Sequence, residues 1–227
     1  MRIDILTLFP AYFASPLEES LLGRAIDAGR VRLDVHDIRQ YTHGPHRTAD
    51  DAPFGGGPGM VMKPEPIFEA VDALGPDPGR VLLLSPAGRR LDQELVRELA
   101  DEPRLVLICG RYEGVDERVV EGLPAEEVSI GDFVLSGGEA AALALVEAVT
   151  RLLPGVVGNE ESLGPESFED GLLDHPHYTR PRSYRGLEVP EALLSGDHAR
   201  IAEWRRMAAV EKTRRNRPDL AGPAGQP

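Results

Sequence analysis

Short aliphatic runs alternate with segments that have the spacing of amphipathic helices over the first 150 residues, and this alternation limits the possible folds. Runs at 3–9, 81–84 and 105–109 are almost entirely apolar and predict buried strands. Between the last two, Asp92 is placed to cap a helix whose apolar side chains share one face. Strands that alternate with helices predict an α/β domain with a largely parallel sheet covered on both faces.

Local signals predict where other elements begin and end. Ser15, with proline and glutamate soon after it, predicts the start of a helix, and Gly29 predicts the end of that helix. A fourth late strand is expected over 127–135. Ser136 and Glu139 then have the spacing of a capping box for a helix that starts at 140.

Several features bear on the compartment. The apolar runs fall far short of the roughly 20 residues that a membrane-spanning helix needs. Asp4 interrupts what would be the apolar core of a signal peptide. The chain has a single cysteine, Cys109, at the end of an apolar run, so no internal disulfide can form and a buried thiol is expected. A cytoplasmic protein is therefore expected.

Charge is distributed unevenly along the chain. The formal net charge is −13, which disfavours nucleic-acid binding if it is taken alone. However, residues 200–217 contain seven basic and two acidic side chains, a net charge of +5. This stretch lies in a helical pattern that begins at Asp197 and would place Ile201, Trp204, Met207 and Ala208 on one face. Composition leaves open whether it is a polyanion-binding surface or a solvated helix face.

Three glycine-containing segments follow predicted strands, at 85–88, 110–114 and 131–138. In a parallel α/β sheet, the edge at the carboxyl ends of the strands is the usual ligand site, and glycine there allows a ligand to approach the backbone. The first strand is not followed by a Gly-x-Gly-x-x-Gly pattern, and no Gly-Lys-Ser/Thr triplet occurs. A pocket is predicted that does not depend on a phosphate cradle.

Other polar and glycine-rich segments are candidates for function. The loop at 52–60 could close over a site or lie against RNA. Acidic residues at 160–174 could supply a general base. His175 and His177 flank Pro176, but no cysteine or carboxylate partner has a recognisable zinc-ligand spacing, so zinc is not predicted.

Five blocks taken together resemble the bacterial tRNA (guanine-N1)-methyltransferase family. The blocks are PFGGGPGM at 53–60, LSP at 84–86, CGRYEGVDER at 109–118, SIGDFVLSGGE at 129–139 and DHPHYTRP at 174–181. The resemblance implies the SPOUT fold, in which an α/β sheet carries a deep C-terminal trefoil knot. It implies a methyltransferase domain at 1–158, a linker at 159–173 and a helical tRNA-binding domain at 174–227. It also implies a homodimer with its sites at the subunit interface.

The resemblance further implies S-adenosylmethionine as cofactor and, as substrate, the tRNA guanine at position 37, immediately 3' of the anticodon. Glu166 matches the position of the family's general base, which is usually aspartate, and Asp174 is the alternative. Arg151 would stabilise charge that develops on the guanine. Magnesium is associated with the family, but no ligand set can be assigned from the sequence. The implied cofactor-binding residues are Leu84, Ser85, Pro86, Gly110, Tyr112, Glu113, Ser129, Ile130, Gly131, Asp132, Phe133, Val134, Leu135, Gly137 and Gly138.

Two alternatives remain open. One is a related knotted methyltransferase that acts on another RNA site and needs no carboxylate near a purine N1. The other is a non-catalytic RNA-binding protein with the same fold, which the glutamate at position 166 would favour.

Overall fold

The computed structural model describes residues 1–158, 166–168 and 171–221. The chain divides into two compact units, Met1–Gly158 and Asn159–Pro227. The linker expected at 159–173 lies partly outside the described residues, so its assignment stays a prediction.

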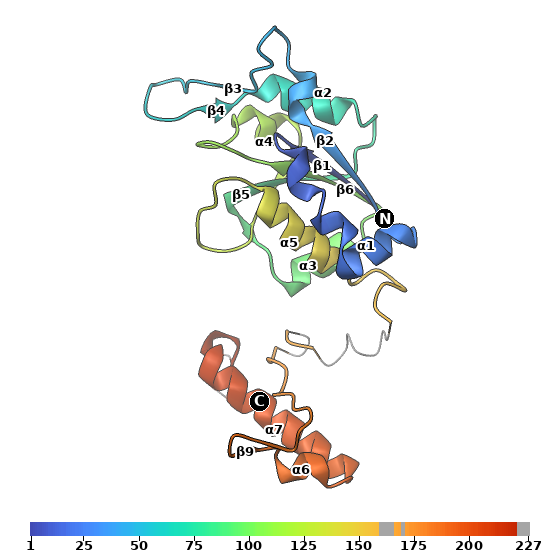
Figure 1. Cartoon of the computed structure of the whole chain (residues 1–227). Helices are drawn as coiled ribbons and strands as arrows, with labels where there is room; N and C mark the ends of the chain where they lie inside the picture. Colours follow the sequence, from blue (N-terminus) through green and yellow to red (C-terminus); the bar gives the residue numbers. More distant parts are fainter. Residues whose placement is uncertain (159–165, 169–170, 222–227) are drawn as a thin grey trace. The chain divides into compact units, whose positions relative to one another are not determined.

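Five parallel strands form the sheet of the first unit, in the order β2-β1-β6-β5-β7 (Figure 1). Their carboxyl ends lie at one edge, because neighbouring residues such as Leu84 of β5 and Cys109 of β6 are in register. The prediction of a parallel α/β sheet is confirmed. The strands are β1 (Arg2–Thr7), β2 (Arg32–Asp37), β5 (Arg80–Arg90), β6 (Arg104–Cys109) and β7 (Glu126–Ser129).

Helices cover both faces of this sheet (Figure 1). Side chains of β6 alternate between two apolar clusters: Leu105 and Leu107 lie in one, and Val106 and Ile108 lie in the other. The first cluster includes residues of α1 (Ser20–Asp27), α3 (Gln93–Ala100) and α5 (Glu139–Thr150). The second includes residues of α2 (Pro64–Asp72) and α4 (Arg118–Gly122).

Several predicted ends are confirmed, but the helix start at Ser15 is wrong. The side chain of Asp92 accepts a hydrogen bond from the amide of Leu95, and Gly29 has a φ of 67° just after α1. Ser15 does not start a long helix, because the chain forms two short 3-10 turns at Pro10–Phe13 and Pro16–Glu18. The helix α1 begins only at Ser20, and Ser15 makes no side-chain capping bond.

A buried carboxylate lies near the amino ends of the strands. The side chain of Asp4 is fully buried and forms ion pairs with Arg2 at 2.7 Å, His36 at 2.8 Å and Arg104 at 2.9 Å. Burial alone would raise the pKa of Asp4, but hydrogen bonds from these three residues lower it to about 2. The carboxylate therefore joins three strands, β1, β2 and β6.

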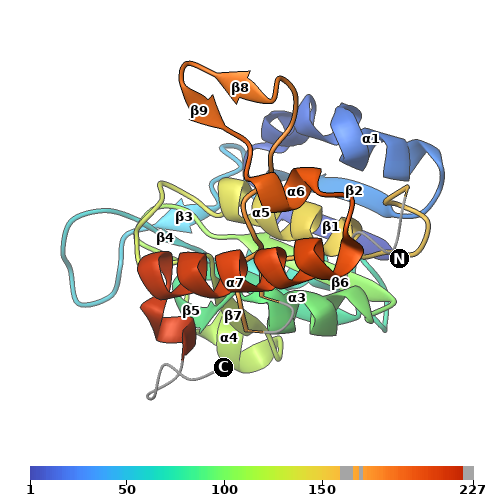
Figure 2. The ribbon, with the colours of Figure 1, turned by 90° about the horizontal axis from the view of Figure 1, so that it is seen from below.

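The second unit has little buried surface. Its elements are β8 (Ser183–Tyr184), β9 (Leu187–Glu188), α6 (Glu191–Leu194), α7 (His198–Asn216) and a 3-10 turn at Pro218–Ala221. The helix α7 begins directly after Asp197, where the helical pattern is expected to start, and the Asp197 side chain caps it, but Met207 is 62% exposed and does not share a buried face with its neighbours. Among the described residues of this unit, only Thr213 is buried. The β8–β9 hairpin extends away from α6 and α7 (Figure 2).

Within the described part of the chain, no helix combines the length and the apolar character that crossing a membrane requires.

Candidate functional site

A cavity of about 330 Å³ lies at the edge of the sheet where β5, β6 and β7 end. Its lining comes from the three glycine-containing segments that the sequence singled out. Of the implied cofactor-binding residues, Asp132 is the exception that does not line it. Those that do are Leu84, Ser85, Pro86, Gly110, Tyr112, Glu113, Ser129, Ile130, Gly131, Phe133, Val134, Leu135, Gly137 and Gly138.

The first segment, 85–88, is not a turn. It continues β5 as an irregular strand, and the register against β7 shifts between Leu84 and Arg89. A Cβ on Gly88 would lie 2.2 Å from the backbone carbon of Glu127, so glycine is needed for the two strands to approach. The predicted turn is therefore replaced by a bulged strand that forms one wall of the cavity.

The second segment, 110–114, connects the cavity to the glycine-rich loop. Tyr112 adopts a left-handed φ of 61°. The amide of Glu113 donates to the carbonyl of Met60 at 3.0 Å, and the amide of Met62 donates to the carbonyl of Gly114 at 2.9 Å. These bonds fasten the end of the loop at 52–60 against the segment. Met62 belongs to β4 (Val61–Met62), which pairs with β3 (Asp50–Asp51).

The third segment begins earlier than expected, because β7 ends at Ser129 rather than near 135. It meets the second segment directly: the amide of Gly138 donates to the carbonyl of Gly110 at 2.9 Å. A Cβ on Gly138 would lie 2.8 Å from the Cα of Cys109, closer than real side chains allow. Glycine at 138 therefore keeps the two backbones in contact beside the cavity.

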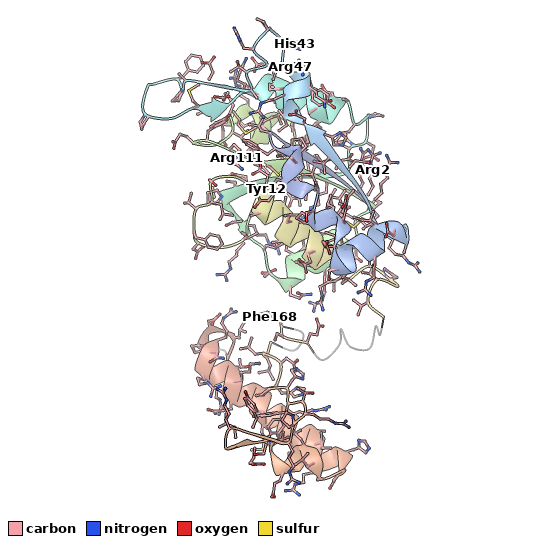
Figure 3. The ribbon with its side chains drawn as sticks, in the orientation of Figure 1. Arg2, Tyr12, His43, Arg47, Arg111 and Phe168 are labelled. Atoms are coloured by element: carbon pink, nitrogen blue, oxygen red, sulfur yellow. The ribbon has the colours of Figure 1, made fainter. Side chains whose placement is uncertain are left out.

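Arg111, which is labelled in Figure 3, and Glu139 hold the third segment in place. The carboxylate of Glu139 is buried and accepts bonds from Arg111 Nε at 3.0 Å and from Thr7 Oγ1 at 2.9 Å. Arg111 also donates to the carbonyl of Ser136 at 3.0 Å. The capping box predicted for Ser136 and Glu139 is therefore wrong, because Gly138 is the N-cap of α5 and Glu139 bonds elsewhere.

Cys109 is fully buried, as predicted, beneath the cavity. Burial raises the pKa of its thiol well above the ordinary value, and the nearby charge of Glu139 adds to this. The thiol is therefore protonated at neutral pH and has the properties of a small apolar side chain.

Arg151 does not lie beside the cavity of its own chain. Gly138 and Ala141, at the start of α5, line the cavity, whereas Arg151 follows the last residue of the same helix. A rise of 1.5 Å per residue puts the two helix ends about 20 Å apart. One chain thus does not bring Arg151 together with its own glycine segments.

Glu166 and Asp174 belong to the second unit. The amide of Asp174 donates to Ser167 Oγ at 2.9 Å, so the residue beside Glu166 is bonded to the alternative base. Burial alone would raise the pKa of Asp174, but hydrogen bonds from the His177 side chain and the His175 amide outweigh it and lower the pKa. The Asp174 carboxylate is therefore ionised at neutral pH.

Asp174 groups with the two histidines on either side of Pro176. Its Oδ1 lies 2.7 Å from His175 Nδ1, and its Oδ2 lies 2.7 Å from His177 Nε2. Histidine nitrogens, cysteine sulfurs and carboxylate oxygens are the side-chain atoms that commonly bind metals. In the part of the chain that the structure describes, this is the one group in which three residues bring such atoms within 4.8 Å of one another. Magnesium prefers oxygen ligands, so a group with two imidazoles does not suit that ion.

The basic stretch at 200–217 lies mainly on α7. The side chains of Arg205, Arg206 and Arg215 are exposed. Lys212, in contrast, donates to the carbonyl of Asp174 at 2.9 Å, and Arg217 pairs with a nearby carboxylate. Part of the predicted basic surface is thus engaged inside the second unit.

Comparison with known proteins identifies the family. The family model described as tRNA (Guanine-1)-methyltransferase TrmD matches residues 1–223. Three relatives carry the name tRNA (guanine-N(1)-)-methyltransferase. The protein of Dehalococcoides mccartyi is 54% identical, with 97% of this chain and 90% of the relative covered. The protein of an Anaeromyxobacter species is 59% identical, again with 97% of this chain and 90% of the relative covered. That of Nocardia farcinica is 54% identical, with 98% of both covered.

Matches of this extent confirm the resemblance that the five sequence blocks indicate. The chain belongs to the tRNA (guanine-1)-methyltransferase family.

Proposed function

We propose that this chain transfers a methyl group from S-adenosylmethionine to N1 of the guanine at tRNA position 37, immediately 3' of the anticodon. The observation that carries the proposal is the meeting of three glycine-containing segments around one cavity in a member of this family. The names of the relatives, which specify guanine N1, support the target atom.

The cavity suits a methyl donor held largely by backbone groups. Gly110 and Gly138 line the cavity without side chains of their own, so a ligand could approach their backbone directly. Leu84 and Pro86 would supply apolar contacts on one wall, and residues 129–135 would lie on the other. When bound, S-adenosylmethionine supplies an electrophilic methyl group on a sulfonium centre.

A carboxylate is needed because N1 of guanine carries a proton. Glu166 would accept that proton as N1 forms a bond to the methyl carbon, whose bond to sulfur breaks and leaves the donor as a neutral thioether. Arg151 would stabilise the negative charge that grows on O6 during proton removal. Asp174 is the second candidate for the base, since its carboxylate is ionised and only half-buried.

The proposed active unit is a homodimer. Support comes from α5, which separates Arg151 from Ala141, the nearest residue of α5 in the cavity lining of the same chain, by about 15 Å. A site completed by Arg151 of the partner subunit would remove this conflict. Exposed apolar side chains at Phe133 and Val134 are further surface that a partner could cover.

The SPOUT trefoil knot, implied by the family, is part of the same proposal. The contact between Gly110 and Gly138 supports it, because the chain leaves β6 and returns alongside the end of that strand. A tRNA substrate is also the reason to propose a cytoplasmic location.

Exposed arginines of the second unit would bind tRNA phosphates. Arg180, Arg182 and Arg185 surround the β8–β9 hairpin, and Arg205 and Arg206 lie on α7. The net charge of +5 over residues 200–217 fits a phosphate backbone, while the acidic remainder of the chain would limit nonspecific binding.

Methyl transfer from labelled donor to an unmodified tRNA transcript tests the activity. We expect transfer to a transcript with guanine at position 37 and none to a matched transcript with adenine there. Glu166→Ala should lower kcat at least about 100-fold, whereas Asp174→Ala should leave most activity. Glu203→Ala, an exposed carboxylate of the same unit, is the matched control. Normal turnover by Glu166→Ala would exclude it as the base, and absence of transfer by the wild type would exclude the function.

Charge reversal tests the RNA surface. Arg214→Glu combined with Arg215→Glu should weaken tRNA binding and reduce the slope of log affinity against log salt by roughly 0.7 to 0.9 for each lost phosphate contact. An unchanged affinity and slope would remove this helix from the binding surface.

A further inference from the structure

We propose that Asp174, His175 and His177 form a binding site for a borderline divalent cation of the zinc type. The three residues lie within four positions of the chain, and each offers one ligand atom, all of which lie within 4.8 Å of one another. The three ligand residues belong to the second unit, whereas the lining of the proposed methyl-donor cavity comes from the first.

The spacing of the ligand atoms is close to that of a metal site. Zinc bonds to nitrogen and oxygen are about 2.0–2.2 Å long, so tetrahedral ligand atoms lie about 3.4 Å apart. The two carboxylate–imidazole pairs, now 2.7 Å apart, would open by less than about 1 Å. The widest pair lies within 4.8 Å and would close by about 1.4 Å at most. Rotation of side chains is enough for these shifts.

The backbone that carries the ligands is already held. The amide of Asp174 donates to Ser167 Oγ at 2.9 Å, and the carbonyl of Asp174 accepts from Lys212 Nζ at the same distance. Pro176 restricts the backbone of the preceding His175 to extended conformations. An ion would therefore bind to a nearly preformed arrangement, with a small loss of chain entropy.

The ligand types select the ion. Two imidazoles and one carboxylate suit zinc and neighbouring first-row metals, whereas magnesium requires oxygen ligands. The side chain of His177 is 70% exposed, so water can reach the cluster and complete the coordination. Lys212 beside Asp174 repels a cation and limits the affinity, but its ammonium bonds to the main-chain carbonyl rather than to the carboxylate.

Zinc titration of the full untagged chain tests the inference without tRNA or methyl donor. Chelator-treated protein would be titrated with Zn²⁺ against a chromophoric chelator, and Co²⁺ absorption would report the coordination. We expect one equivalent per chain and visible Co²⁺ bands. His175→Gln and His177→Gln should each weaken binding roughly tenfold or more, and the double variant should abolish it.

His198→Gln is the matched control, because it removes an exposed histidine of the same unit outside the cluster. It should bind zinc as the wild type does, and excess Mg²⁺ should not displace the zinc. Circular dichroism would show that the variants remain folded. The site is refuted if the wild type binds no zinc, if the double variant retains the affinity, or if Mg²⁺ competes at equal concentration. These readouts do not depend on methyl transfer, so they stand apart from the test of the proposed function.

Discussion

The two units are stabilised in different ways. In the first, two apolar clusters enclose the sheet, and bonds between backbone segments such as Gly110 and Gly138 form the cavity. In the second, Thr213 is the one buried residue among those described, and polar contacts tie the segment around Asp174 to α7. The proposed donor cavity is therefore on a rigid scaffold, while the proposed base lies on a unit with little core.

This difference predicts separable stabilities. Opening free energies range from near zero in weakly packed regions to the global value in the core. Substitutions in the first unit should therefore lower global stability, whereas substitutions in the second should change local opening alone.

The largest effect is expected at the buried carboxylate. Asp4→Asn leaves Arg104 without its charged partner and removes the buried one of the two carboxylates that pair with Arg2, so it should cost about 3–5 kcal/mol of unfolding free energy. A fall in Tm of roughly 6–20 °C is expected, measured by calorimetry at pH 7. Asp34→Asn is the control, since Asp34 is paired with Asp4 in the register of β1 and β2 but is partly exposed. It should cost less than about 1 kcal/mol. Equal losses of unfolding free energy in Asp4→Asn and Asp34→Asn would show that burial of the Asp4 carboxylate is not what makes it important.

The lowered pKa of Asp4 also predicts how the stability of the protein depends on pH in the acid range. Because the folded-state pKa of Asp4 is about 2, below the ordinary 3.8, its contribution is present above about pH 4 and is lost as the pH falls towards 2. Roughly 2 kcal/mol of unfolding free energy should be lost over this pH range. Urea unfolding of wild type and Asp4→Asn at pH 7, 4 and 2.5 would measure it. The difference in unfolding free energy between the two proteins should narrow only at low pH. A difference that stays constant with pH would contradict the lowered pKa of Asp4.

A smaller effect is expected at the cavity. Gly138→Ala forces a methyl group against Cys109 and Gly110, which should cost about 1–3 kcal/mol and raise the KM for the methyl donor about tenfold or more. Gly158→Ala is the matched control, because a Cβ there meets no atom within 4 Å. Unchanged donor binding by Gly138→Ala would mean that the donor does not occupy this cavity.

The smallest effect is expected in the second unit. Thr213→Val removes the acceptor for the amide of Leu173, a bond of 2.8 Å, and should cost about 1 kcal/mol. Hydrogen exchange should accelerate at Leu173 but not at Val106 in β6. Thr213→Ser keeps the hydroxyl and should behave as the wild type. Accelerated exchange in β6 would show that the two units unfold together.

The sequence predicted the elements whose signals are local. Aliphatic runs gave the positions of β5 and β6, and the capping chemistry of Asp92 and Gly29 marked helix ends correctly. Nearly every residue that the resemblance implied for the cofactor lines a single cavity, although the role of these residues remains a proposal.

The wrong predictions involve partners far away in the sequence. Residues 85–88 extend because they pair with β7, and Glu139 leaves its expected capping role because Thr7 and Arg111 compete for its carboxylate. The ligand cluster at Asp174 escaped notice for a different reason. A carboxylate directly beside His175 does not match the spacing of known zinc motifs, and only the folded turn shows that the ligand atoms converge.

In the proposed dimer, the length of α5 predicts that two different inactive variants can complement each other. The helix α5 has Gly138 at its start and Arg151 at its end. Each chain would therefore contribute its cavity to one active site and its Arg151 to the other. Two inactive proteins, one altered at each end, should then complement each other when they are mixed. In such a hybrid one centre would hold both defects, and the other would be intact.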